Sequence, residues 1–122
     1  MRLVISGTRH CPGAEALLEK AYAISPWVSC DVHILHGASG DVDYAAVCLA
    51  AKHHWSCEAF GAEWKAYGKA AGPIRNRAMA FECDAVLALW DGKSRGTLSM
   101  MTEAVRAGKP VFVYPINLQT TR

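Results

Sequence analysis

The sequence lacks the features that would place the protein in a membrane or in an oxidising compartment. No apolar stretch approaches the roughly 20 residues that a helix needs to span a bilayer. The apolar run within Met1–Gly7 is too short for a signal peptide, so we expect a buried first strand there. The five cysteines are scattered, odd in number and without a CxxC pair. These absences predict reduced thiols, no membrane partner and a cytoplasmic location.

An excess of charge of one sign is also missing. Thirteen Lys and Arg against 11 Asp and Glu leave a net charge of +2, which does not by itself indicate a nucleic-acid or membrane partner. No basic run, charged tail or low-complexity segment is present. With 52% hydrophobic and 20% charged residues, the chain is predicted to be globular rather than disordered. Its 122 residues fit one domain, spanning 1–122, with one core.

Short apolar runs alternate with helical patterns along the chain. Apolar residues with helical spacing precede the second strand and follow the second, third and fourth. In one of these helices, Ile74, Ala78 and Phe81 share an apolar face, which leaves Arg75 and Asn76 at its margin. The alternation predicts an α/β fold, with a five-stranded parallel sheet covered on both faces in three layers. The predicted strands are 3–6, 32–36, 58–60, 85–90 and 111–114, and the helical patterns are 14–24, 42–53, 74–81 and 98–105.

Every glycine-rich turn follows a predicted strand. These turns are Ser6-Gly7-Thr8-Arg9, residues 36–40 and residues 91–97. Because the carboxyl ends of parallel strands share one edge of a sheet, we expect the three turns to converge where ligands bind in such folds. The last turn opens a helix, whose first backbone N–H groups can bind an anion, and Lys93 and Arg95 add positive charge. An ordinary turn before a helix would show the same pattern.

Residues 67–79 contain two arginines at the start of a predicted helix. Pro73 suits the first turn, where its missing N–H costs nothing. Arg75, Asn76 and Arg77 follow in the early turns. A guanidinium binds phosphate through paired hydrogen bonds, which makes Arg75 the better ligand candidate. The alternative is that both arginines are solvated surface charges.

These segments together resemble a known family. Read in order, the chain resembles the YspA/YpsA-related branch of the SLOG superfamily, Rossmann-like proteins related to the Lonely Guy phosphoribohydrolases. The matching blocks span nearly the whole chain in the family's order, and Trp64–Met79 is the most specific of them. The blocks are Ser6–Arg9, His36–Asp43, Glu63–Met79 and Ser94–Thr97 followed by Ala104, Gly108 and Pro110.

The resemblance implies a single Rossmann-like domain that binds a nucleotide or a phosphoribosyl-containing small molecule at the C-terminal edge of the sheet. Asp43 would bind a ribose hydroxyl, although a carboxylate in the first turn of a helix is favourable by itself. Gly96 and Thr97 would present N–H groups and a hydroxyl to phosphate. The expected ligand-binding residues are Ser6, Gly7, Thr8, Arg9, Gly37, Asp43, Arg75, Asn76, Ser94, Gly96 and Thr97.

Whether the chain is an enzyme is left open. The phosphoribohydrolases carry a catalytic glutamate three residues after the Gly-Thr threonine, and Met100 stands there in this chain. Glu103 lies one turn further on, about 4.5 Å along the helix axis, so the candidate catalytic residues are Arg75, Glu103 and Asp43. The alternatives to a sensor or binding module are a hydrolase cleaving an N-glycosidic or phosphoester bond of a nucleotide, and an interaction or DNA-processing accessory protein. The near-neutral charge counts against nucleic acid.

Other candidate sites are weaker. His53, His54 and Cys57 lack a second ligand pair, so no metal and no cofactor are predicted. Cys11 follows Arg9 and His10 and would be a nucleophile if its pKa were low. Trp90 is the tryptophan placed to stack on a base. The four tryptophans and the hydrophobic composition also leave room for a homodimer.

Overall fold

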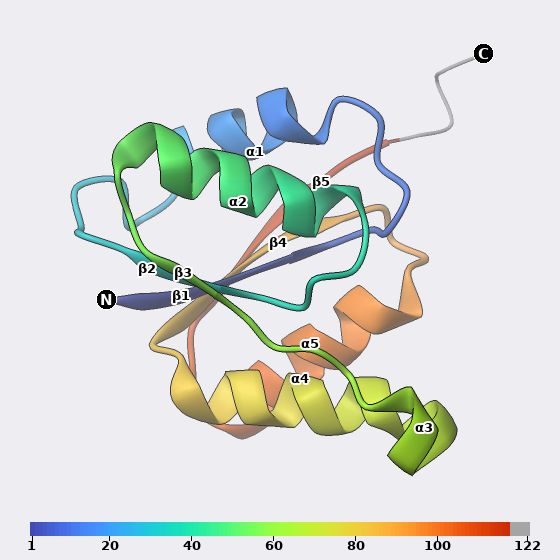
Figure 1. Cartoon of the computed structure of the whole chain (residues 1–122). Helices are drawn as coiled ribbons and strands as arrows, with labels where there is room; N and C mark the ends of the chain where they lie inside the picture. The colour runs from blue at the N-terminus through green and yellow to red at the C-terminus, as the bar shows by residue number, and fades with distance from the viewer. Residues whose placement is uncertain (118–122) are drawn as a thin grey trace.

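Strands and helices alternate along the chain in the computed structural model, which describes residues 1–117 (Figure 1). All five predicted strands are present, with bounds within one residue of those expected. The strands are β1 (Arg2–Gly7), β2 (His33–His36), β3 (Cys57–Ala59), β4 (Ala85–Trp90) and β5 (Val111–Pro115). The helices are α1 (Ala14–Ala23), α2 (Asp41–His53), α3 (Trp64–Tyr67), α4 (Ala71–Glu82) and α5 (Arg95–Arg106), with a 3-10 turn at Gly68–Ala70.

The five strands form one parallel sheet in the order β3-β2-β1-β4-β5. The central strand β1 pairs on one side with β2, where Val4 is opposite Leu35, and on the other with β4, where Val4 is opposite Val86. The chain therefore runs outward from β1 to β3 and then returns to build the other half from β4. Strand order reverses between β1 and β4, which is where ligands bind in open α/β sheets.

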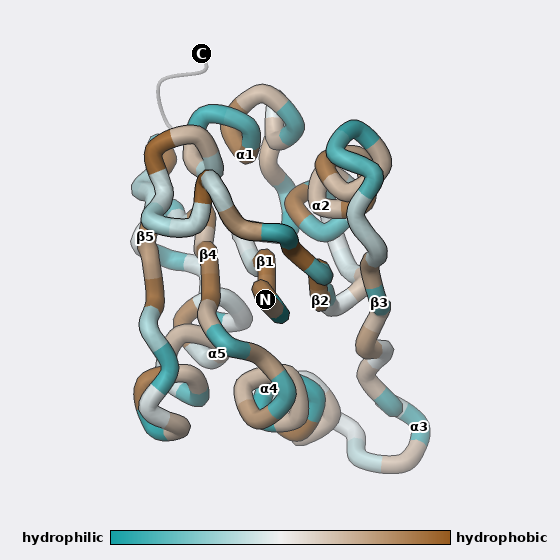
Figure 2. Tube along the Cα trace, turned by 90° about the vertical axis from the view of Figure 1, so that its left-hand side faces the viewer, coloured by the Kyte–Doolittle hydropathy of each residue, from teal (hydrophilic) through white to brown (hydrophobic). Residues whose placement is uncertain are grey.

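Helices cover both faces of the sheet, as the three-layer prediction required. Helices α1 and α2 lie on one face and α4 and α5 on the other (Figures 1 and 2). Successive residues of β1 point to opposite faces, so Leu3 and Ile5 join the core under α1 and α2 while Val4 joins the core under α4 and α5. All three side chains are fully buried. Burial on both faces explains why the strands are continuous apolar runs rather than alternating ones.

Helix α4 buries a different face from the one that the sequence predicted. Ile74 and Phe81, expected on its apolar face, are 42% and 79% exposed. The buried face instead carries Asn76, Met79 and Ala80. Met79 and Ala80 pack in the core between the sheet and α5, and Asn76 finds hydrogen-bond partners on α5. In α5, likewise, Leu98 and Val105 are exposed and the buried residues are Thr97, Met100, Met101 and Ala104.

No helix within residues 1–117 is long and apolar enough to cross a membrane.

Candidate functional site

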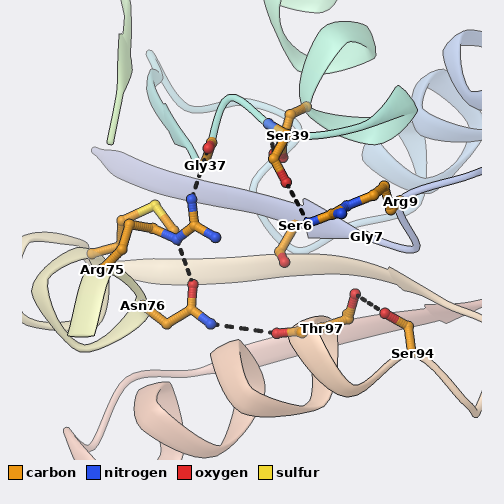
Figure 3. Close-up of a pocket in the computed structure, with 12 residues that line it drawn as sticks. Ser6, Gly7, Arg9, Gly37, Ser39, Arg75, Asn76, Ser94 and Thr97 are labelled. Atoms are coloured by element: carbon orange, nitrogen blue, oxygen red, sulfur yellow. Dashed lines mark hydrogen bonds between the residues drawn. The ribbon is translucent and has the colours of Figure 1, made fainter. Parts of the chain in front are cut away.

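A cleft of about 260 Å³ opens at the carboxyl ends of the central strands. It lies where the turns after β1, β2 and β4 meet and where α4 contributes two polar side chains (Figure 3). The structure thus brings together every residue that the sequence named as a ligand contact, except Thr8. Two residues that the sequence did not indicate, Ser39 and Met79, also line the cleft. The lining residues are Ser6, Gly7, Arg9, Gly37, Ser39, Asp43, Arg75, Asn76, Met79, Ser94, Gly96 and Thr97.

Arg75 reaches the cleft from α4 and is fixed by three hydrogen bonds. Its Nη1 donates to the carbonyl oxygens of Gly37 at 2.7 Å and Phe60 at 3.1 Å, and its Nε donates to Asn76 Oδ1 at 2.9 Å. Nη2 has no hydrogen-bond partner within the described residues, and Figure 3 shows it pointing into the cleft. Burial lowers the pKa of Arg75, an effect that Asp43 opposes and Arg9 reinforces. A half-buried cation without an ion pair in the described part of the chain is suited to an anionic ligand.

The turn after β2 is shaped by two titratable side chains. Asp43 Oδ2 accepts the backbone N–H of Ser39 at 2.8 Å, and His36 Nδ1 accepts that of Ala38 at 3.0 Å. The neutral His36 ring therefore carries its proton on Nε2, and burial lowers its pKa. Burial raises the pKa of Asp43, against the lowering effects of its hydrogen bonds, His36 and Arg75. Asp43 supports the turn and is also the carboxylate that faces the cleft.

The turn between β4 and α5 is held by its own side chains. Asp91 Oδ1 accepts the backbone N–H groups of Lys93 at 2.9 Å and Ser94 at 2.8 Å, and the Trp90 indole donates to the Ser94 carbonyl at 3.0 Å. Burial would raise the pKa of Asp91, but the hydrogen bonds from Lys93 and Ser94 help to hold it below its usual value. Trp90 anchors the turn and lies outside the cleft lining, so it is not placed as a base-stacking platform.

The first turn of α5 presents backbone donors to the cleft. The N–H of Leu98 bonds to the Ser94 carbonyl at 3.2 Å, so the N–H groups of residues 95–97 precede the helix ladder. The Ser94 and Thr97 hydroxyls contact each other at 3.2 Å. A Cβ added at Gly96 would meet no heavy atom within 4 Å, so the approach to these donors is open. This arrangement suits a phosphate or another small anion. Lys93 and Arg95 are exposed and do not line the cleft.

Two glycines are explained by close approach of neighbouring side chains. A Cβ at Gly7 would lie 2.5 Å from Val42 of α2, and one at Gly37 would lie 2.5 Å from Arg75 Nη1. Gly7 therefore allows α2 to pack against the end of β1, and Gly37 allows the arginine to reach its carbonyl. Both glycines also line the cleft, so packing alone accounts for their presence and a ligand contact remains a prediction.

The structure does not place Glu103 in the cleft. Its carboxylate lies between α4 and the end of α5, 3.6 Å from Arg77 Nε and 3.5 Å from Arg106 Nη1. Met100, at the position of the relatives' glutamate, is fully buried in the core. Among the lining residues the candidate catalytic groups are thus Arg75 and Asp43 alone. The pairing of Arg75 with Glu103 that was considered from the sequence is not assembled in the cleft.

Thr8 and Cys11, in the segment that follows β1, differ from the roles that were considered from the sequence. Thr8 is buried outside the cleft lining, and its side chain is among the groups that lower the pKa of Asp91. Burial, together with Asp41 and Asp91, raises the pKa of Cys11, so the thiol is not activated as a nucleophile. Within residues 1–117, no three His, Cys, Asp or Glu side chains are grouped so that they could hold a metal ion.

Comparison with solved structures identifies the fold. The chain matches DNA processing protein A (DprA) from Streptococcus pneumoniae with a TM-score of 0.76 and 20% identity, over 96% of this chain and 51% of that one. It therefore spans about half the length of that protein. The C-terminal domain of a Pyrococcus furiosus hydrogenase matches with a TM-score of 0.50 and 15% identity, over 93% of this chain and 90% of that one. No protein-family model and no curated protein matches the chain.

These comparisons and the sheet order define the class of protein. The chain is a Rossmann-like α/β domain with a five-stranded parallel sheet, and it shares this fold with DprA. At 20% identity the likeness concerns the fold, so function must be argued from the cleft.

Proposed function

We propose that the protein binds a nucleotide, or another small molecule carrying a phosphoribosyl group, in the cleft at the carboxyl edge of the sheet. One observation carries this proposal. Arg75 and the first turn of α5 line the same cleft, and Arg75 Nη2 has no hydrogen-bond partner among residues 1–117. Guanidinium and helix N-terminal donors together are a combination suited to phosphate.

The remaining lining groups suit the sugar of such a ligand. Asp43 offers carboxylate oxygens that can accept hydrogen bonds from hydroxyls, and Ser6 and Ser39 offer hydroxyls. A cleft of about 260 Å³ is at the small end of ligand sites. It has room for a phosphoribosyl unit, while a larger ligand such as a dinucleotide would extend past its rim.

The chemistry supports binding rather than turnover. Asp43 is the one carboxylate of the lining, and it is already engaged with the turn after β2. A displaced Glu103 supplies no second acid or base. We infer a sensor or binding module, and we place it in the YspA/YpsA-related branch of the SLOG proteins on the strength of the block Glu63–Met79.

The test is calorimetry with nucleoside 5′-monophosphates, ribose 5-phosphate and ADP-ribose, with the unphosphorylated nucleosides as ligand controls. We expect saturable heat from at least one phosphorylated compound. Arg75→Ala should weaken that binding on the order of 10- to 100-fold, because a charge-assisted hydrogen bond is lost. Arg77→Ala is the matched control, since Arg77 lies on the same helix outside the cleft and should bind normally.

Absence of binding across the whole panel would reject the proposal. Chromatography of the same mixtures after incubation addresses the hydrolase alternative. Release of free base or inorganic phosphate, abolished by Asp43→Asn, would show that the cleft turns its ligand over. Glu103→Gln should leave both binding and any release unchanged, because Glu103 lies outside the cleft.

A further inference from the structure

Asn76 lies between Arg75 and the first turns of α5, and its side chain is bonded to both. The residue is 5% exposed. Its Oδ1 accepts the Nε–H of Arg75 at 2.9 Å (Figure 3). Its Nδ2 donates to Ser99 Oγ at 3.1 Å and to the Gly96 carbonyl at 3.4 Å. A single amide group therefore connects the guanidinium to the helix that supplies the backbone donors.

The packing of α4 against α5 does not by itself require an amide here. A buried amide is unfavourable unless its donors and acceptor find partners, and an apolar side chain of similar volume would fill the same space. Asparagine is also a modest helix former. What an apolar side chain cannot supply is an acceptor for Arg75 Nε and, on the other side, a donor for α5. The amide supplies both at once.

The bond to Asn76 is one of three that decide where Arg75 points. The carbonyls of Gly37 and Phe60 accept the two N–H groups of Nη1. The bond from Nε to Asn76 anchors a second nitrogen of the planar guanidinium. Nη2 is then directed into the cleft (Figure 3).

We propose that Asn76 is a positioning residue, which orients Arg75 and holds it in register with the first turn of α5 so that both bind one phosphate group. This inference rests on the proposed function. It specifies the ligand further: one phosphate contacts the guanidinium and the α5 N–H groups together, rather than two separate anions occupying the two halves of the cleft.

Three substitutions test the hydrogen bonds of Asn76 separately. Asn76→Leu removes both links while keeping a side chain of four heavy atoms branched at Cγ. Asn76→Asp keeps the acceptor for Arg75 Nε but turns an acceptor against the Gly96 carbonyl and places a negative charge beside the guanidinium. Ser99→Ala removes one partner of the amide and leaves the bond to Arg75.

The test combines two measurements on the full chain. The first is the NMR signal of the Arg75 Nε proton in the ligand-free protein, which should be protected from solvent exchange in the wild type and in Asn76→Asp but not in Asn76→Leu. The second is calorimetry with ribose 5-phosphate and adenosine 5′-monophosphate. We expect Asn76→Leu and Asn76→Asp to lose on the order of tenfold or more in affinity, and Ser99→Ala to lose less. Arg77→Ala breaks a different contact between α4 and α5 and should change neither signal nor affinity.

Each outcome is decisive. Protection lost together with affinity in Asn76→Leu supports the inference, and the retained proton signal of Asn76→Asp with weakened binding separates orientation from charge. A folded Asn76→Leu that binds either compound with wild-type affinity would overturn the inference while leaving the proposed function intact. A wild-type protein that binds neither compound, nor any other in the wider panel, would reject the proposed function and this inference with it.

Discussion

Space for Arg75 depends on the absence of a side chain at Gly37. A Cβ at that position would lie 2.5 Å from Nη1 and 3.3 Å from Asp43 Oδ2. The turn is not held open by an unusual glycine conformation, because Gly37 is not among the residues with positive φ. Glycine is therefore needed at position 37 because a side chain would occupy the space of the Arg75 guanidinium.

Replacing Gly37 with alanine should weaken ligand binding without unfolding the protein. The added methyl group must displace the guanidinium, so we expect a loss on the order of 10- to 100-fold in affinity for the phosphorylated ligand. Calorimetry measures the affinity, and thermal unfolding checks that the fold persists. Gly61→Ala is the matched control, because a Cβ there would meet no heavy atom within 4 Å. Equal affinity in both variants would contradict the role given to this contact.

At the scale of single residues, the sequence predicted which residues line the cleft better than it predicted why those residues are needed there. Gly7, Gly37 and Gly96 were predicted as ligand contacts, and all three line the cleft. The side chains of Val42 and Arg75 that require Gly7 and Gly37 belong to distant segments, so this reason could not be obtained from the local motif. Thr8 illustrates the opposite case: it stands inside the motif, yet it does not line the cleft.

At the scale of elements, the largest difference concerns which side of α4 is buried. Periodicity placed Ile74 and Phe81 inside, and the structure places Met79 and Ala80 there. The pattern was wrong because the buried face also carries small residues and the polar Asn76, which forms hydrogen bonds to Arg75, Gly96 and Ser99. The bounds of β1 and β4, in contrast, follow from nearly continuous apolar runs and were predicted closely.

Truncating one side chain on each face of α4 should show, through the free energy of unfolding, which face is buried. Phe81→Ala should change the free energy of unfolding by less than about 0.5 kcal/mol, since an exposed side chain contributes little. Met79→Ala should cost about 2 to 4 kcal/mol, because Met79 is 2% exposed and leaves a cavity. Denaturant unfolding of both variants gives the comparison. A larger loss for Phe81 would mean that this face is covered in solution.

For the molecule as a whole, the convergence of three turns follows from strand order. The sequence predicted alternating strands and helices, and therefore a common edge for all turns that follow strands. Which two strands flank the reversal could not be deduced, because strand order depends on packing between distant segments. The structure supplies the order, and the reversal between β1 and β4 lies beside the residues of the cleft.

The overall charge leads to a prediction about nucleic acid. The fold is shared with a DNA processing protein, but the net charge of this chain is +2, and the three exposed cations near the cleft are Arg9, Lys93 and Arg95. We expect no complex with duplex or single-stranded DNA in a mobility-shift assay at about 200 mM salt, and at most a weak one at about 50 mM. A complex that survives the higher salt concentration would favour the DNA-processing alternative.

The hydrogen bonds of Arg75 to Gly37, Phe60 and Asn76 also bear on the thermodynamics of binding. A free arginine side chain loses considerable rotamer entropy when a ligand immobilises it, and this loss reduces affinity. Here the side chain is already ordered by the fold, so the loss is incurred during folding and not during association. The cleft is preorganised, and a small ligand can bind well through few contacts because little of the protein has to become ordered around it.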